Sequence, residues 1–150
     1  MLDIDCELKI LLTRLAELRL PCALCGGLAM AVHGHPRATF DIDLVALGGS
    51  ASAIAQAARA LGFTLNAAPM KLAGGRVEIT RVSKASPAAD DDVLPLDILA
   101  LDSAIENEMR FEETEWEGIP LRVVDRASLI RLKQLRDSAQ DRADIEKIRS

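Results

Sequence analysis

The chain has 150 residues, a formal net charge of −5 and 3% aromatic residues, with no tyrosine. This length is typical of one domain, so we expect residues 1–150 to form a single domain with its own core. The mild negative charge argues against a protein held on nucleic acid by phosphate neutralisation, and the few aromatic side chains argue against a base-stacking platform. A small anionic ligand that arrives with its own metal ion remains compatible with this charge.

The first half of the chain alternates between helical and strand-like patterns. Leucines at helical spacing predict an amphipathic helix over residues 5–19, which Pro21 ends. A short buried strand over residues 22–25 runs directly into a pair of glycines. The further elements expected here are a helix over 28–33, a strand over 40–47, a helix over 51–61 and a strand over 63–65.

The second half contains more strands and ends in helices. We expect strands over 76–82 and 93–99, loops over 69–75 and 86–92, a short helix over 103–109, and a hairpin formed by 111–116 and 119–124. Asp125 or Ser128 caps a helix that runs through Arg136, and a last helix covers 139–149. This order predicts an α/β (α+β) fold with a single mixed sheet flanked by helices.

The cysteines indicate a reducing compartment. Their number is odd, the N-terminus is acidic rather than signal-like, and no long apolar span is present, so we expect a cytoplasmic protein without a membrane segment. Cys22 and Cys25 form a C-x-x-C pattern, but no second pair completes a zinc site. Residues three apart on a strand also face opposite ways, so we interpret both as small buried side chains.

The most informative motif combines Gly26 and Gly27 with Asp41 and Asp43. Glycines at the start of a helix leave backbone N–H groups free to hold a phosphate. Asp41 and Asp43 lie in an apolar, strand-like run, where side chains two residues apart share a face and can converge on one divalent cation or bracket two. The combination indicates a metal–nucleotide site, whereas the alternative is two surface carboxylates on an edge strand.

Phosphoryl chemistry with two metal ions calls for a third carboxylate from a neighbouring strand. Asp97 fits because it is the one charged residue in the apolar run 93–99, although it could instead cap the turn that follows. The acidic run 90–92 is interpreted as a solvated turn. The expected metal is Mg²⁺, which prefers carboxylate and phosphate oxygens.

Other charged residues keep two interpretations each. Arg37 either reaches the phosphates of a nucleotide or pairs with a carboxylate. His33 and His35 are assigned structural or supporting roles, because imidazole suits zinc better than a carboxylate site. By local pattern Lys133, Asp141 and Asp144 fit a charged surface, with the two aspartates on one helix face. In the sharper interpretation Lys133 donates to nucleotide phosphates and Asp141 orients it.

The string Gly26-Gly27-x-Ala29 and the following residues 33–44, which contain Arg37, Thr39, Asp41 and Asp43, resemble the nucleotidyltransferase superfamily that includes DNA polymerase β. More closely, they resemble the branch of AbiEii-type toxins of abortive-infection systems and related bacterial proteins. The C-terminal stretches 129–133 and 140–145 are similar to that branch as well. The resemblance implies a nucleotidyltransferase-like core with C-terminal helices.

By this resemblance, Gly26 and Gly27 lie at the triphosphate, and Asp41, Asp43 and Asp97 are metal ligands and catalytic residues. Arg37 and Thr39, which belong to the same string, are assigned to nucleotide binding. Lys133 and Asp141 fall where the branch places its later functional lysine and aspartate. The implied activity is transfer of a nucleoside monophosphate from an NTP to a hydroxyl acceptor, which is a tRNA, a protein or a small molecule.

Two departures from the branch support a different class of function. Ser138 stands where the branch often carries arginine, with Arg136 shifted, and Leu28 replaces a small hydroxylated residue after the glycines. The main alternative is therefore a non-catalytic protein of the same fold that binds a nucleotide or a partner, and a metal-dependent nucleotide hydrolase is the third. A homodimer or an antitoxin-like partner protein would complete the acceptor site.

Overall fold

The computed structural model describes residues 2–150 and has one mixed sheet of eight strands flanked by helices, which confirms the expected α/β class. The helices are α1 (Ile4–Glu17), α2 (Gly26–Val32), α3 (Ala51–Ala60), α4 (Ser103–Glu108), α5 (Arg126–Arg136) and α6 (Ala139–Arg149), with a 3-10 turn η1 (Ala73–Gly75). The strands are β1 (Cys22–Cys25), β2 (Ile42–Ala46), β3 (Leu65–Asn66), β4 (Met70–Leu72), β5 (Val77–Ser86), β6 (Ala89–Leu101), β7 (Phe111–Trp116) and β8 (Ile119–Val124).

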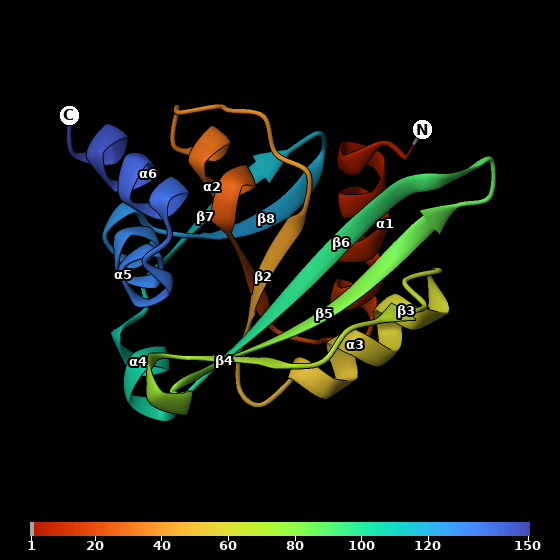
Figure 1. Cartoon of the computed structure of the whole chain (residues 1–150), viewed down its shortest axis with the longest axis horizontal. Helices are drawn as coiled ribbons and strands as arrows, with labels where there is room; N and C mark the ends of the chain where they lie inside the picture. The colour runs from red at the N-terminus through yellow and green to blue at the C-terminus, as the bar shows by residue number, and fades with distance from the viewer. Residues whose placement is uncertain (1) are drawn as a thin grey trace.

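The strand order is β3-β5-β6-β2-β1-β8-β7, with β4 paired to β5 beside β3. Strand β2 runs parallel to β6 and antiparallel to β1, so the sheet is mixed at its centre. Figure 1 shows the long β5–β6 hairpin reaching away from α5 and α6, which pack side by side near the other end of the molecule. Helices α1 and α3 pack against one another, and α3 also contacts β5 and β6.

Strand β2 is buried along its whole length, which explains its nearly continuous apolar sequence. Ile42, Leu44 and Val45 are fully buried in the core, where covering elements on both faces of a central strand exclude water. Asp43 is the exception, because it interrupts this run with a carboxylate that is itself 4% exposed. The fold therefore places a charged group at the centre of its core sheet.

The C-terminal helices start at well-formed N-caps. Asp125 caps α5 by accepting a hydrogen bond from the backbone N–H of Ser128 at 2.8 Å, so the first of the two expected caps is confirmed. Ser138 caps α6 in a reciprocal capping box with Asp141. The turn between the two helices is short and passes through Asp137, whose φ of 53° is left-handed.

Several expected boundaries were wrong. The strand expected over residues 63–65 lies at Leu65–Asn66 instead. The expected polar loop over residues 86–92 is mostly strand, because β5 and β6 continue their backbone ladder and leave only a tight turn between Ser86 and Ala89. The expected loop over residues 69–75 contains β4 and η1, since Met70–Leu72 pairs with β5. The strand expected from Phe40 begins only at Ile42, and Phe40 is 80% exposed.

Within residues 2–150, none of the helices combines the length and the apolar character that crossing a bilayer requires.

Candidate active site

Three aspartates meet at one point of the central sheet. Asp43 on β2 is the register partner of Asp97 on β6, and Asp41 precedes β2 by one residue. One carboxylate oxygen from each of Asp41, Asp43 and Asp97 lies within 4.8 Å of the other two. The structure therefore brings the Asp-x-Asp motif and the predicted third carboxylate to the same face. It excludes the interpretations of Asp41 and Asp43 as edge-strand surface charges and of Asp97 as a turn cap.

Asp43 carries the electrostatic cost of this convergence. Among the side chains that the structure describes, those of residues 2–89 and 91–150, its Oδ1 is the one buried oxygen or nitrogen without a hydrogen-bond partner. Burial and the neighbouring charges of Asp41 and Asp97 raise the pKa of Asp43 to about 7. Burial and Asp97 also raise the pKa of Asp41, against the opposing charge of Arg81. Carboxylates this crowded and this poorly solvated are stabilised by a cation.

The glycine pair is packed against these carboxylates. Gly26 begins α2 with a φ of +67°, and a side chain there would overlap Asp43, with an added Cβ 2.6 Å from Cγ. Gly27 faces a second group, since its Cβ would lie 2.7 Å from the hydroxyl oxygen of Thr39 and 3.2 Å from Nη1 of Arg37. Both positions therefore require glycine for close approach, and Gly26 requires it also for its left-handed φ.

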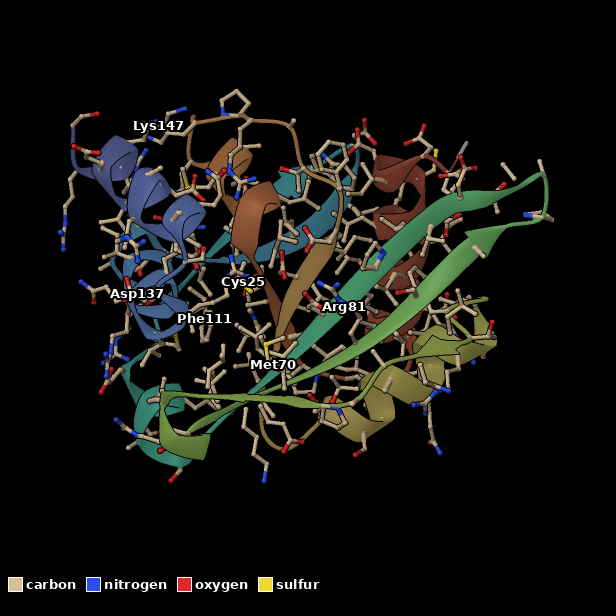
Figure 2. All side chains as sticks on the ribbon, viewed as in Figure 1. Cys25, Met70, Arg81, Phe111, Asp137 and Lys147 are labelled. Atoms are coloured by element: carbon tan, nitrogen blue, oxygen red, sulfur yellow. The ribbon has the colours of Figure 1, made fainter. Side chains whose placement is uncertain are left out.

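Arg81 is a member of the site that sequence reasoning missed. Its Nε and Nη2 donate to the two carboxylate oxygens of Asp97 at 2.7 and 2.8 Å, and Nη2 lies 3.8 Å from Oδ2 of Asp41. Figure 2 shows Arg81 extending from β5 across β6 toward β2. These charge-assisted hydrogen bonds raise the pKa of Arg81 further. No sequence pattern marks Arg81, because its role depends on its pairing with Asp97 across two strands.

Lys133 and Asp144 form a buried ion pair between α5 and α6. The Nζ of Lys133 donates to Oδ2 of Asp144 at 2.8 Å and lies 3.7 Å from Oδ1 of Asp141. Arg37 reaches the same aspartate with two hydrogen bonds of 3.0 and 2.9 Å, and Gln140 adds a fourth at 2.8 Å. Although burial opposes it, these donors lower the pKa of Asp144 to about 2.

Asp141 is held in the same way by the neighbouring arginine. Arg136 donates to both its oxygens at 2.8 and 2.7 Å, and the hydroxyl and backbone N–H of Ser138 donate to Oδ2 at 2.6 and 3.0 Å. Although burial opposes it, these bonds lower the pKa of Asp141. The shifted Arg136 thus engages the aspartate directly, and Ser138 caps the helix that carries it.

The prediction of a charged surface at Lys133, Asp141 and Asp144 was wrong. Lys133 is 2% exposed, and both aspartates are fully buried. The error has a physical cause: the apolar residues of α5 and α6 are too few for a plain amphipathic pattern, because part of the interface between these helices is built from paired charges.

The other sequence candidates are placed as follows. Arg37 forms an ion pair with the carboxylate of Asp144, which agrees with one of the two interpretations given for it above. His33 is buried, with Nε2 at 2.8 Å from the backbone carbonyl of Val124, in keeping with a structural role. Cys22 and Cys25 are free thiols on β1, and burial together with the charge of Asp43 raises the pKa of Cys25 well above its usual value. Cys25 is therefore a small buried side chain, as expected, whereas Cys22 is only partly buried.

A small cavity adjoins Asp43 between the sheet and α5. Its volume is about 30 Å³, and its walls include Gly26, Lys133 and Arg136 together with apolar side chains of β5 and α5. This volume accepts one or two water molecules and is far below that of a typical small-molecule site. Buried Lys133 and more exposed Arg136 line this cavity next to Asp43, and its volume is too small for a nucleoside.

The donor set fits a hard divalent cation. Three carboxylates converge, one of their oxygens is buried without a partner, and no soft ligand lies among them. Mg²⁺ binds such oxygens and keeps part of its water shell. Asp41 is half-buried at the edge of the cluster, so water can reach an ion bound there. The residues present are therefore suited to hold Mg²⁺.

A mixed sheet that carries a glycine pair at a helix start and three converging aspartates defines a protein of nucleotidyltransferase fold. Comparison with known families identifies the family within this fold. The profile of the family described as "Nucleotidyl transferase AbiEii toxin, Type IV TA system" matches residues 10–133. The chain belongs to this family.

Solved structures agree on the fold. TM1012 of Thermotoga maritima, described as a nucleotidyltransferase, superposes with a TM-score of 0.59 at 14% identity, over 93% of this chain and 88% of its own. ANT(2″)-Ia, solved with adenylyl-2″-tobramycin, gives 0.59 at 15% identity over 92% and 83%. JHP933 of Helicobacter pylori gives 0.53 at 16% identity, over 94% of this chain and 62% of its own. Comparison with curated protein sequences gives no match.

Proposed function

We propose that residues 1–150 form one nucleotidyltransferase domain that transfers a nucleoside monophosphate from an NTP to a hydroxyl acceptor and releases pyrophosphate. The observation that carries the proposal is the meeting of Asp41, Asp43 and Asp97 within 4.8 Å, with one oxygen of Asp43 unpaired. Three crowded, buried carboxylates destabilise the fold by charge repulsion and desolvation. A bound cation would offset both effects, so such a cluster is typical of a functional site.

In this proposal Asp41, Asp43 and Asp97 hold Mg²⁺, with two ions as the preferred number. When bound, these ions supply activation of the attacking hydroxyl and neutralise charge on the leaving pyrophosphate. We assign Asp97 to the side of the attacking hydroxyl. The chain itself contributes by holding the three carboxylates in register on β2 and β6, so that little reorganisation is needed when the charges arrive.

We assign the nucleotide phosphates to the neighbourhood of Gly26 and Gly27. The crowding at both glycines keeps this backbone bare, which lets a phosphate approach closely. Arg37 and Thr39 flank Gly27, and we place them beside the phosphates in the nucleotide complex. Lys133 lines the cavity next to Asp43, so it is positioned to supply a positive charge there.

Asp141 has a different part in this proposal. All its hydrogen bonds are internal, and they fix Arg136 and the start of α6 beside Lys133. We therefore assign Asp141 to orienting the cations of the site rather than to touching the nucleotide.

The family match favours a toxin of a toxin–antitoxin pair, and we propose this role together with an antitoxin-like partner. ANT(2″)-Ia, which was solved with an adenylylated aminoglycoside, shows one kind of acceptor that the fold accommodates in another protein. For this chain the acceptor stays open among a tRNA, a protein and a small molecule.

A second candidate is a non-catalytic protein that binds a nucleotide or a partner. The volume of about 30 Å³ next to Asp43 favours the partner-binding form of this candidate, because a nucleoside enters this cavity only if its walls move. Calorimetry separates the candidates at the first step. We would titrate each NTP with Mg²⁺ into the wild type, the Asp41→Ala/Asp43→Ala variant and an Asp91→Ala control, whose exposed aspartate lies on the same strand as Asp97.

The transferase requires Mg²⁺-dependent NTP binding in the wild type and the control but not in the double variant. It also requires pyrophosphate release when a tRNA, protein or small-molecule acceptor is added. NTP binding without any transfer supports the second candidate. Absence of NTP binding in all three proteins contradicts the nucleotide site altogether.

A further inference from the structure

Arg81 stands in one row with the carboxylates of the site. The backbone register pairs Arg81 with Asp97, and Asp97 with Asp43, across three neighbouring strands. Register partners point to the same face of a sheet, so these three side chains rise from the sheet side by side. Arg81 is the positive end of this row, and its guanidinium also approaches Asp41 to 3.8 Å.

We propose that Arg81 occupies the cation position of the metal-free protein and that a divalent cation displaces it from Asp97. This inference rests on the proposed metal site. The guanidinium uses both oxygens of Asp97 and faces Oδ2 of Asp41, which are the lone pairs that coordination by Asp41 and Asp97 requires. Mg²⁺ takes an oxygen from each carboxylate at about 2.0–2.1 Å, and at that distance its charge repels the guanidinium that is bonded to both oxygens of Asp97.

Charge and burial explain why an arginine is present there. The side chain of Asp97 is only 5% exposed, and it lies beside two other carboxylates. An ionised group in that position requires a positive partner, which is Arg81 before the metal arrives and the metal afterwards. Without either, the repulsion among the three aspartates would be relieved by protonation or by loss of structure.

Exposure explains why Arg81 is the cation that moves. Its side chain is 46% exposed, so it is free to turn toward solvent without leaving a cavity in the core. Lys133, at 2% exposure, is tied to Asp144, and Arg136 is tied to Asp141 by two hydrogen bonds. Of these three cations, Arg81 is thus the one that combines contact with the metal carboxylates and room to leave them.

The test is cation affinity, measured with Mn²⁺ by calorimetry and by loss of the free-ion electron paramagnetic resonance signal. We expect Arg81→Ala and Arg81→Gln to bind Mn²⁺ about tenfold more tightly than the wild type, because the metal no longer breaks charge-assisted hydrogen bonds. Two substitutions are used because a glutamine oxygen could itself become a ligand. Arg81→Lys, which keeps the charge but not the two-point geometry, should fall between.

Arg76→Gln is the matched control. Arg76 is 45% exposed and donates to Asp102 at 2.9 Å, but it lies five residues before Arg81, about 16 Å along an extended chain. Its Mn²⁺ affinity should equal that of the wild type. A second readout is the melting temperature, which Arg81→Ala should lower in EDTA and recover in saturating Mn²⁺.

This inference is overturned if the Arg81 variants bind Mn²⁺ as the wild type does or more weakly. If Mn²⁺ binding by the wild type still depends on Asp43, the metal site itself stands. That result would mean that Arg81 only positions Asp97. Absence of Mn²⁺ binding in the wild type and in every variant overturns the proposed metal site, and the inference falls with it.

Discussion

Replacing Asp43 by asparagine should make the metal-free protein more stable at neutral and alkaline pH. Asp43 is 4% exposed, its Oδ1 has no hydrogen-bond partner, and its pKa is raised to about 7 by burial and by Asp41 and Asp97. The difference from its ordinary value of 3.8 corresponds to about 4 kcal/mol. Because Asp41 and Asp97 share this cost, we expect Asp43→Asn to raise the free energy of unfolding by about 2–4 kcal/mol at pH 8.

The direction of the pH dependence follows from the raised pKa. Below pH 3.8 Asp43 is protonated in both the folded and the unfolded chain, so its ionisation costs the folded state nothing. Between pH 3.8 and about 7 the unfolded chain ionises while the folded chain resists, and the wild type loses stability as the pH rises. The stability gained by Asp43→Asn should therefore grow across this window and level off above it.

Urea unfolding in EDTA from pH 4 to pH 8 measures this directly. Asp91→Asn is the control, since Asp91 is exposed on β6 and its replacement should change stability by less than about 0.5 kcal/mol at every pH. Saturating Mg²⁺ should then remove the advantage of Asp43→Asn, because only the wild type gains binding energy. A stability difference between the wild type and Asp43→Asn that does not vary with pH would refute the reasoning.

Two further substitutions test the surroundings of the triad. Lys133→Met should lower the free energy of unfolding by about 2–4 kcal/mol in urea titrations at pH 7, because it leaves the buried Asp144 short of one donor; a loss below 0.5 kcal/mol would point to a solvated lysine. Gly26→Ala should abolish Mn²⁺ binding in calorimetry, because its Cβ overlaps Asp43. Gly48→Ala, with a similar φ of +61° but open space around it, should bear only backbone strain of about 1–2 kcal/mol and keep its metal affinity.

The sequence predicted the features that local patterns determine. Apart from β4 and η1, the order of helices and strands follows from spacing and residue type, as do the glycine pair at a helix start and the two aspartates at Asp41 and Asp43. Asp97 was found because it is a charge in an otherwise apolar strand, and the structure places it in parallel register with Asp43. A charged residue within a buried strand is informative because the cost of burying its charge has to be offset by a partner charge or a metal ion nearby.

What the sequence did not reveal depends on pairing between distant segments. Arg81 looks like one of many surface arginines until the β5–β6 register sets it opposite Asp97. Lys133 and Asp144 look like surface charges because helical periodicity counts apolar residues and does not show that two charges bury each other. The start of β6, residues 89–92, was missed for a related reason, since backbone pairing rather than side-chain character extends that hairpin.

The ion pairs also explain how a motif near the N-terminus and one near the C-terminus act on one site. Arg37 lies four residues before Asp41 and is bound by two hydrogen bonds to Asp144 on α6. Asp144 is bound in turn to Lys133 on α5, whose side chain lines the cavity at Asp43. The C-terminal helices therefore fix both the loop that delivers Asp41 and the cation beside Asp43. Arg37, Asp144 and Lys133 are hydrogen-bonded to one another, and such a network holds its side chains in place. Arg81 is more exposed, so it is the side chain that can move when a cation binds.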